Sequence, residues 1–188
     1  MDIDTAGLED ALQVLGNLLA DRGQHYEIAA IGGGSLLLLG LITRTTKDLD
    51  LVALIEENEL VSVDPMPQAL ARAVDEVGQA LELGKGWLNA GPASLLKKGL
   101  PFGFMTRLHI REYKGLTVYL ADRFDQICFK LYASVDQGPQ SKHYIDLIAL
   151  KPTYEELEKA KNWCITHDPS EPFEKDLNCA IKSIYASQ

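Results

Sequence analysis

The sequence predicts an α/β protein in which an α/β core over residues 1–120 is followed by a helical part over residues 121–188. In the first part, short apolar segments typical of buried strands alternate with amphipathic segments that have helical spacing. The second part holds helical patterns without a strand pattern. Because no flexible linker composition separates the two parts, we expect the helical part to pack on the core.

The start of the core predicts a helix, a strand, a short helix and a second strand in that order. Leucine and alanine recur at helical spacing behind Asp4 and Thr5, two residue types that cap helix N-termini. The mostly apolar residues 26–31 run into three glycines, which indicates a buried strand leading to a tight turn. The patterns that follow predict a short helix over 35–42, a strand over 48–55 and a helix over 67–83.

The remaining segments predict a loop, a hairpin and a series of helices. Residues 84–103 are rich in glycine and proline and predict a loop with little secondary structure. Residues 105–121 predict a hairpin that turns at Lys114 and Gly115. Helices are then expected over 123–135 with Asp122 as its cap, over 142–150, over 153–167 with a capping box formed by Thr153 and Glu156, and over 170–186.

Composition and charge exclude several classes of protein. Apolar residues make up 46% and charged residues 24%, which fits a soluble globular chain. Apolar runs such as Leu36–Leu39 are far too short to span a bilayer, and the acidic N-terminus does not resemble a secretory signal, so a cytoplasmic protein without a membrane partner is expected. A net charge of −9 argues against non-specific coating of nucleic acid. A local basic cleft is still expected, formed by Arg44, Lys47, Lys97, Lys98, Arg107 and Arg111.

The segment from Ile31 to Leu51 places a glycine turn close to an Asp-Leu-Asp sequence. On a strand, Asp48 and Asp50 share one face while the leucines beside them enter the core. Two adjacent carboxylates repel each other unless water or a cation lies between them, and Mg²⁺ prefers such oxygen ligands. The segment therefore predicts a magnesium site formed by Asp48 and Asp50, with the glycine turn and Ser35 holding the triphosphate of a nucleotide.

These residues resemble the signature of the nucleotidyltransferase fold typified by DNA polymerase beta. In "GGGS", twelve residues and "DLDL", the chain has the glycine turn, the spacing and the alternating aspartates of that signature. The segments "RTTKDLDL", "WLN", "KLYA", "SKHYIDL" and "KPTYEELEKAKNW" together resemble a bacterial branch of minimal nucleotidyltransferases related to abortive-infection toxins. The resemblance implies a small mixed sheet flanked by helices.

The resemblance also implies roles for individual residues. The paired glycine position falls on Gly32-Gly33, Gly33-Gly34 or Gly34-Ser35, and the spacing to Asp48 favours the last pair. The fold uses a third carboxylate, for which Glu112 is the candidate. The implied catalytic residues are Asp48, Asp50 and Glu112, the nucleotide-binding residues are Gly33, Gly34, Ser35, Arg44, Lys47 and Lys130, and Lys142 and Asp146 are additional candidates.

Two functions from different classes follow. In the first, an enzyme moves a nucleoside monophosphate from a nucleoside triphosphate (NTP) to a hydroxyl on RNA, such as tRNA, or on protein, and it could be the toxin of a module with a cognate antitoxin. In the second, the fold has lost catalysis and serves as a nucleotide-sensing or partner-binding module, antitoxin-like or regulatory. Some of these residues also have a structural explanation. Lys142 and Asp146 are spaced like a surface ion pair, and Lys130 lies in an apolar helix from which its ammonium group can extend to solvent.

Overall fold

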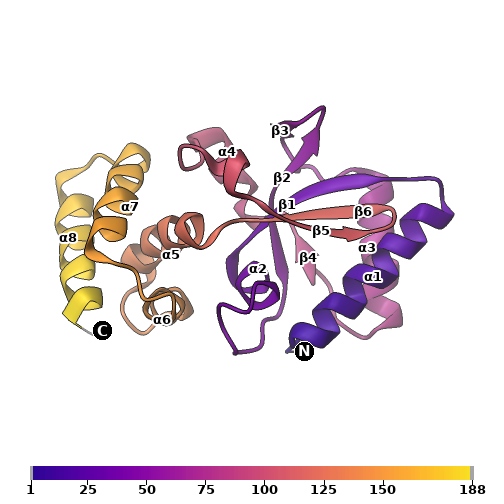
Figure 1. Cartoon of the computed structure of the whole chain (residues 1–188), viewed down its shortest axis with the longest axis horizontal. Coiled ribbons are helices and arrows are strands. Elements are labelled where there is room, and N and C mark those ends of the chain that lie inside the picture. Colours follow the sequence, from indigo (N-terminus) through magenta and orange to yellow (C-terminus); the bar gives the residue numbers. More distant parts are fainter. Residues whose placement is uncertain (1, 187–188) are drawn as a thin grey trace. The chain divides into compact units, whose positions relative to one another are not determined.

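The computed structural model describes residues 2–186 of the chain. They fold into two compact units, one ending at Ala121 and the other beginning at Asp122. The first unit contains a six-stranded mixed sheet flanked by helices, and the second is helical (Figure 1). The predicted fold class, a mixed α/β protein with a helical C-terminal part, is confirmed.

The first unit contains every strand of the sheet. Its elements are α1 (Thr5–Asp21), β1 (Tyr26–Ile31), α2 (Gly32–Leu38), β2 (Leu49–Glu56), β3 (Glu59–Val61), α3 (Gln68–Ala80), β4 (Leu88–Asn89), the 3₁₀ helix η1 (Gly91–Ala93), α4 (Ser94–Lys98), the 3₁₀ helix η2 (Phe104–Arg107), β5 (His109–Tyr113) and β6 (Leu116–Leu120). The predicted loop over residues 84–103 was therefore wrong in part, because it contains the short elements β4, η1 and α4.

The sheet has the strand order β3-β2-β1-β6-β5, and β4 pairs with the start of β2. The central pair β1 and β6 is parallel, whereas β1 with β2 and β5 with β6 are antiparallel. The hairpin formed by β5 and β6 turns at Lys114 and Gly115, as predicted. The order places β2 near one edge of the sheet and β5 at the other, which matters for the candidate site.

One face of the sheet is covered by helices and forms the main core. α1 packs against α3 and also contacts β5 and β6. The core side chains of the strands alternate, as in Ile28 and Ala30 of β1 or Leu49 and Leu51 of β2, and all four are fully buried. The side chains between them therefore point to the opposite face, and this face receives Asp50.

The second unit consists of four helices, α5 (Arg123–Gln137), α6 (Lys142–Ala149), α7 (Tyr154–His167) and α8 (Glu171–Ala186). Local signals in the sequence begin these helices where expected. The Asp122 carboxylate accepts a hydrogen bond from the backbone N–H of Phe124, and Thr153 and Glu156 form the predicted capping box. None of the helices within residues 2–186 combines the length and the apolar character needed to cross a membrane.

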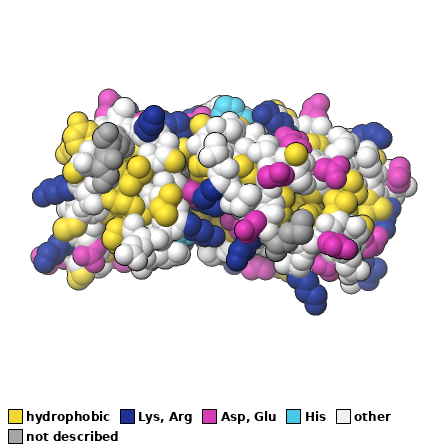
Figure 2. All heavy atoms as spheres, turned by 90° about the horizontal axis from the view of Figure 1, so that it is seen from below, with side chains coloured by type: hydrophobic (Ala, Val, Ile, Leu, Met, Phe, Trp, Pro, Cys, Tyr) yellow, Lys and Arg dark blue, Asp and Glu magenta, His cyan; other side chains and the backbone are white. Residues whose placement is uncertain are grey.

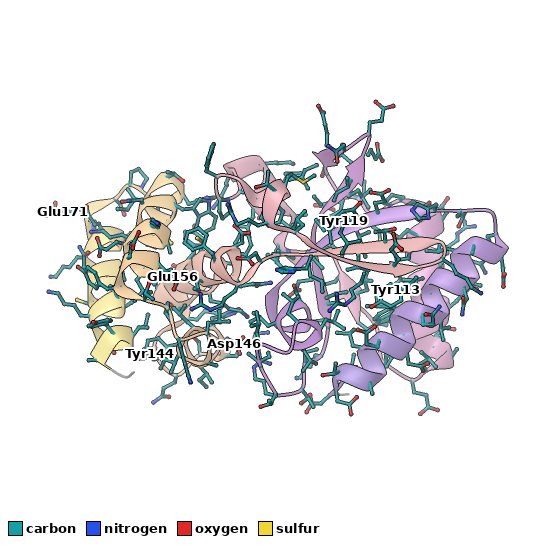
Figure 3. The ribbon with its side chains drawn as sticks, viewed as in Figure 1. Tyr113, Tyr119, Tyr144, Asp146, Glu156 and Glu171 are labelled. Atoms are coloured by element: carbon teal, nitrogen blue, oxygen red, sulfur yellow. The ribbon has the colours of Figure 1, made fainter. Side chains whose placement is uncertain are left out.

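A buried ion pair joins two helices of the second unit. Lys130 Nζ on α5 donates a hydrogen bond of 2.7 Å to Asp146 Oδ2 on α6, and the two side chains are 3% and 1% exposed. Figure 3 labels Asp146 on its helix. The interpretation of Asp146 as half of a surface ion pair with Lys142 is wrong, because its carboxylate is buried and binds Lys130 instead.

Breaking this ion pair should destabilise the second unit. In Lys130→Met, the Asp146 carboxylate stays buried without its cation, which costs about 3–5 kcal/mol, whereas Lys130→Met/Asp146→Leu should recover most of the loss. Urea unfolding followed by the fluorescence of Trp163, in a Trp87→Phe background, reports on this unit because Trp163 lies in α7. A single substitution that costs less than about 1 kcal/mol would contradict the assignment of a structural role to the pair.

Candidate nucleotide-binding site

The two aspartates lie where β2 begins. Asp48 directly precedes the strand and Asp50 is its second residue, and both side chains are half-buried. Leu49 and Leu51 between and after them are fully buried, so the predicted alternation of carboxylates and core leucines is confirmed. The strand thereby holds both carboxylates on the face opposite to the helix-covered core.

The glycine turn lies directly against this aspartate pair. β1 ends at Ile31, whose register partner on β2 is Asp50, and α2 begins at the next residue. Gly32 has a φ of +80°, and a Cβ atom added there would lie 2.6 Å from Asp50 Oδ2. A Cβ on Gly34 would lie 2.6 Å from the backbone oxygen of Asp48. Glycine is required at both positions because any other side chain would displace the aspartates.

Two residues of the connection to β2 complete this side of the site. A Cβ on Gly33 would lie 3.0 Å from Arg44 Nη2, so the guanidinium group covers the glycine turn. Arg44 Nη1 also donates to the backbone oxygen of Thr45 at 3.0 Å. Thr46 Oγ1 donates to the backbone oxygen of Asp48 at 3.1 Å, and its own backbone pairs with Ile3. The connection therefore places the positive charge of Arg44 at the site, and the pairing of Thr46 with Ile3 holds its backbone in position.

Asn89 is a site residue that the sequence reasoning did not identify. β4 pairs with β2 so that Asn89 is the register partner of Asp50, and Asn89 Nδ2 donates to Asp50 Oδ1 at 3.2 Å. Its Oδ1 accepts from the backbone N–H of Gly91 at 2.8 Å, which fixes the orientation of the amide. The buried Trp87 anchors this strand through a hydrogen bond from Nε1 to the backbone oxygen of Val74. The segment "WLN" was the available signal, but a two-residue strand has no recognisable period.

The remaining predicted nucleotide-binding residues differ in position. Ser35 is fully buried, and within residues 2–186 its Oγ has no hydrogen-bond partner. Lys47 is exposed beside Asp48. Lys130 belongs to the second unit and binds Asp146 there. The structure thus brings together Gly33, Gly34, Arg44, Asp48 and Asp50. The Lys130 ammonium group instead binds the buried Asp146 carboxylate.

Glu112 is not brought to the aspartate pair. It lies on the edge strand β5, which is separated from β2 by β1 and β6, a lateral distance of about 14 Å at the usual strand spacing. Glu112 pairs with Thr117 of β6, which in turn pairs with Glu27 of β1. Asp50 instead pairs with Ile31 at the other end of β1, which adds a separation of about 13 Å along the strand direction. The prediction that Glu112 is the third carboxylate of the site is therefore wrong, because the strand register keeps it away from Asp50.

The oxygen donors suit a magnesium ion that shares its ligands with a substrate. Within residues 2–186, no group of three His, Cys, Asp or Glu side chains could hold a metal ion. Mg²⁺ is commonly bound through one or two carboxylates together with substrate phosphates and water. Asp48 and Asp50 meet that requirement, and the carboxylate of Asp50 is kept in place by Asn89 and by the glycine turn.

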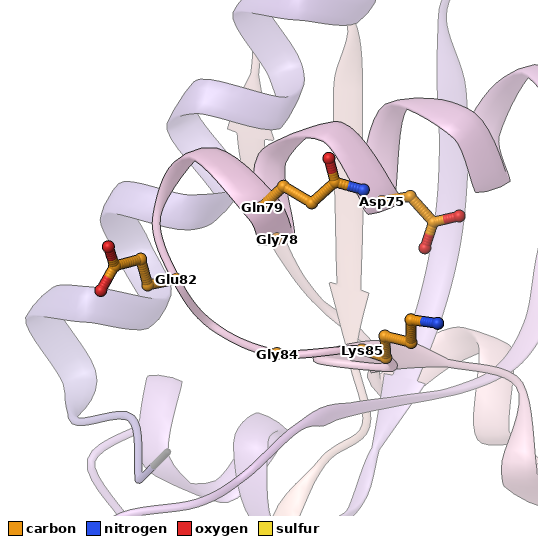
Figure 4. Close-up of a pocket in the computed structure, with 6 residues that line it drawn as sticks. All are labelled: Asp75, Gly78, Gln79, Glu82, Gly84 and Lys85. Atoms are coloured by element: carbon orange, nitrogen blue, oxygen red, sulfur yellow. The ribbon is translucent and has the colours of Figure 1, made fainter.

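A separate hollow of about 540 Å³ lies between the end of α3 and the loop that leads to β4 (Figure 4). It is lined by Asp75, Gly78, Gln79, Glu82, Gly84 and Lys85. Asp75 and Lys85 project on the same side of the hollow, whereas Glu82 points away from them. None of the aspartates or glycines of the candidate site lines it, so the two features are distinct.

Comparison with known protein families gives a match over most of the chain. A family model described as "Nucleotidyltransferase of unknown function (DUF6036)" matches residues 7–149, which include the glycine turn, both aspartates and Asn89. No curated protein and no solved structure shows significant similarity to the chain.

The contact between Gly32 and Asp50 can be tested against a second glycine of the same backbone class. Gly32 and Gly40 have φ values of +80° and +69°, but a Cβ on Gly40 would meet nothing within 4 Å. Gly40→Ala should cost about 1–2 kcal/mol from backbone strain, and Gly32→Ala should cost about 1–3 kcal/mol more because the Cβ overlaps Asp50. Urea unfolding measures both values, and equal losses would show that Asp50 moves away freely.

Proposed function

The chain belongs to the nucleotidyltransferase family whose model spans residues 7–149, and from this premise we propose that it binds a Mg²⁺–NTP complex through Asp48 and Asp50. In this proposal the nucleoside monophosphate is transferred to a hydroxyl group of an acceptor. The observation that carries the proposal is the contact of the Asp50 carboxylate with the glycine turn, since a metal ligand and a phosphate-binding backbone then share one site.

Each residue of the site has a distinct task. The glycine turn lets phosphate oxygens approach the backbone, and the Arg44 guanidinium offsets their negative charge. Asn89 orients Asp50 and satisfies one of its oxygens without adding charge. When bound, Mg²⁺ would neutralise the phosphates and lower the pKa of the attacking hydroxyl.

The proposed transfer is a single displacement at phosphorus. The acceptor oxygen forms a bond to the α-phosphorus, the bond from that phosphorus to the bridging oxygen of the β-phosphate breaks, and pyrophosphate leaves. The hydroxyl proton is released to water. Asp48 and Asp50 would hold the Mg²⁺ ion that binds the triphosphate, and this would keep the α-phosphorus in line with the acceptor.

A second function, a nucleotide-sensing or partner-binding module without catalysis, has one specific observation in its favour. The fold normally adds a third carboxylate to the pair, and the strand register keeps Glu112 away from it. Such a module would still bind NTP but would not release pyrophosphate. A toxin role with a cognate antitoxin would extend the first function and depends on nucleotide transfer.

Calorimetric titration tests the site directly. Wild type should bind at least one NTP in the presence of Mg²⁺ and lose most of the affinity in EDTA. Asp48→Asn and Asp50→Asn should each weaken binding by at least about tenfold, since even the neighbours of a metal ligand commonly contribute this much. Glu112→Gln is the matched control and should bind like wild type, because Glu112 lies far from the pair.

The same proteins separate catalysis from binding. Release of labelled pyrophosphate in the presence of total RNA or protein, abolished in Asp50→Asn and retained in Glu112→Gln, would support the transferase. Binding without release would support the module, and absence of binding to every NTP by wild type would overturn both.

A further inference from the structure

One segment of the first unit lacks acidic residues altogether. Aspartate and glutamate account for 27 of the 188 residues, about one in seven, yet none occurs in residues 83–111. We call residues 83–111 the basic segment. It carries the cations Lys85, Lys97, Lys98, Arg107 and Arg111 together with His109. On the face shown in Figure 2, acidic and basic side chains are scattered among each other. The basic segment therefore differs in charge from the chain as a whole, whose net charge is −9.

The basic segment also presents an aromatic ring to solvent. The side chain of Phe102 is 100% exposed, although the preceding Pro101 is buried. Gly99 and Gly103 on either side have positive φ values of 101° and 77°, and the backbone N–H of Phe104 donates to the backbone oxygen of Pro101 at 3.0 Å. The ring therefore stands on a tight turn held by its own backbone. A single exposed hydrophobic residue is ordinary, but its position among cations is informative.

Cations flank this ring on both sides in the sequence. The exposed Lys97 and Lys98 end α4, directly before Gly99. On the other side, the Arg107 guanidinium folds back toward the turn, since a Cβ on Gly103 would lie 2.6 Å from its Nη1. Lysines at a helix C-terminus also complement the helix dipole, but α4 spans five residues and has a small dipole. An exposed ring between cations, with no carboxylate in the segment, matches the chemistry of base stacking and phosphate binding.

We propose that the basic segment binds a single-stranded nucleic acid, with one base stacked on Phe102 and the backbone phosphates contacting Lys97, Lys98 and Arg107. Proteins that bind single strands combine these two features, an aromatic platform and a positively charged track. An acidic peptide would satisfy the cations but would gain little from an isolated flat ring. The exposed ring of Phe102 thus favours nucleic acid over an acidic protein as the partner.

The basic segment links Phe102 and the cations beside it to the candidate nucleotide-binding site. It contains Asn89, which contacts Asp50, and both η1 and α4 pack against β2, the strand that carries Asp50. A nucleic acid bound at Phe102 would supply the hydroxyl group that the proposed transfer needs. This identification of the nucleic acid as the acceptor rests on the proposed function, whereas binding to the basic segment does not.

Fluorescence anisotropy with labelled oligo-U RNA and oligo-T DNA of about 12 nucleotides tests the binding. The assay contains EDTA and no NTP, so failure of the nucleotide site cannot affect it. Phe102→Ala should raise the dissociation constant about 5- to 150-fold through loss of stacking. Lys97→Gln/Lys98→Gln should reduce the slope of log affinity against log salt by about 1.4, because each phosphate contact on a single strand contributes about 0.7.

Matched controls come from the second unit. Tyr154→Ala removes an exposed aromatic ring there, and Lys175→Gln/Lys182→Gln removes two exposed lysines of α8. Both controls should bind like wild type. Preference for RNA would assign the ligand to RNA through its 2′-hydroxyls, and equal binding of DNA would assign it to single strands in general. Absence of binding by wild type, equal losses in the controls, or equally effective displacement by poly-glutamate would overturn the proposal.

Discussion

The contact between the Asp50 carboxylate and the backbone of Gly32 organises the candidate site. It exists because β1 and β2 pair with Ile31 opposite Asp50, so that the turn after β1 and the start of β2 occupy the same place. Glycine at positions 32 and 34 keeps that place open, and Asn89 and Arg44 approach from two further segments. One strand register thus brings together the glycine turn, which we propose binds phosphate, and the aspartate pair, which we propose binds the metal ion.

Local patterns in the sequence were enough to predict much of the fold. The alternation of leucine and aspartate placed Asp48 and Asp50 on one face, and side-chain caps such as Asp122 and Thr153 began helices as expected. These features depend on neighbours a few residues away. They are therefore readable without knowledge of tertiary structure.

Other parts of the site depend on contacts between distant segments. Glu112 was misplaced because its distance from the aspartates follows from the order and register of four strands. Asn89 was missed because a two-residue strand becomes visible only through its pairing with β2. Lys130 looked available for phosphate because its buried partner Asp146 lies on another helix.

The most direct test of the account is a crystal structure with Mn²⁺ and an NTP analogue that has a methylene group between its α- and β-phosphates. We expect an anomalous peak at the carboxylates of Asp48 and Asp50, with the triphosphate against the glycine turn at residues 32–34. A nucleotide bound elsewhere, for example in the hollow lined by Asp75 and Lys85, or an ordered nucleotide without metal at the aspartates, would contradict it.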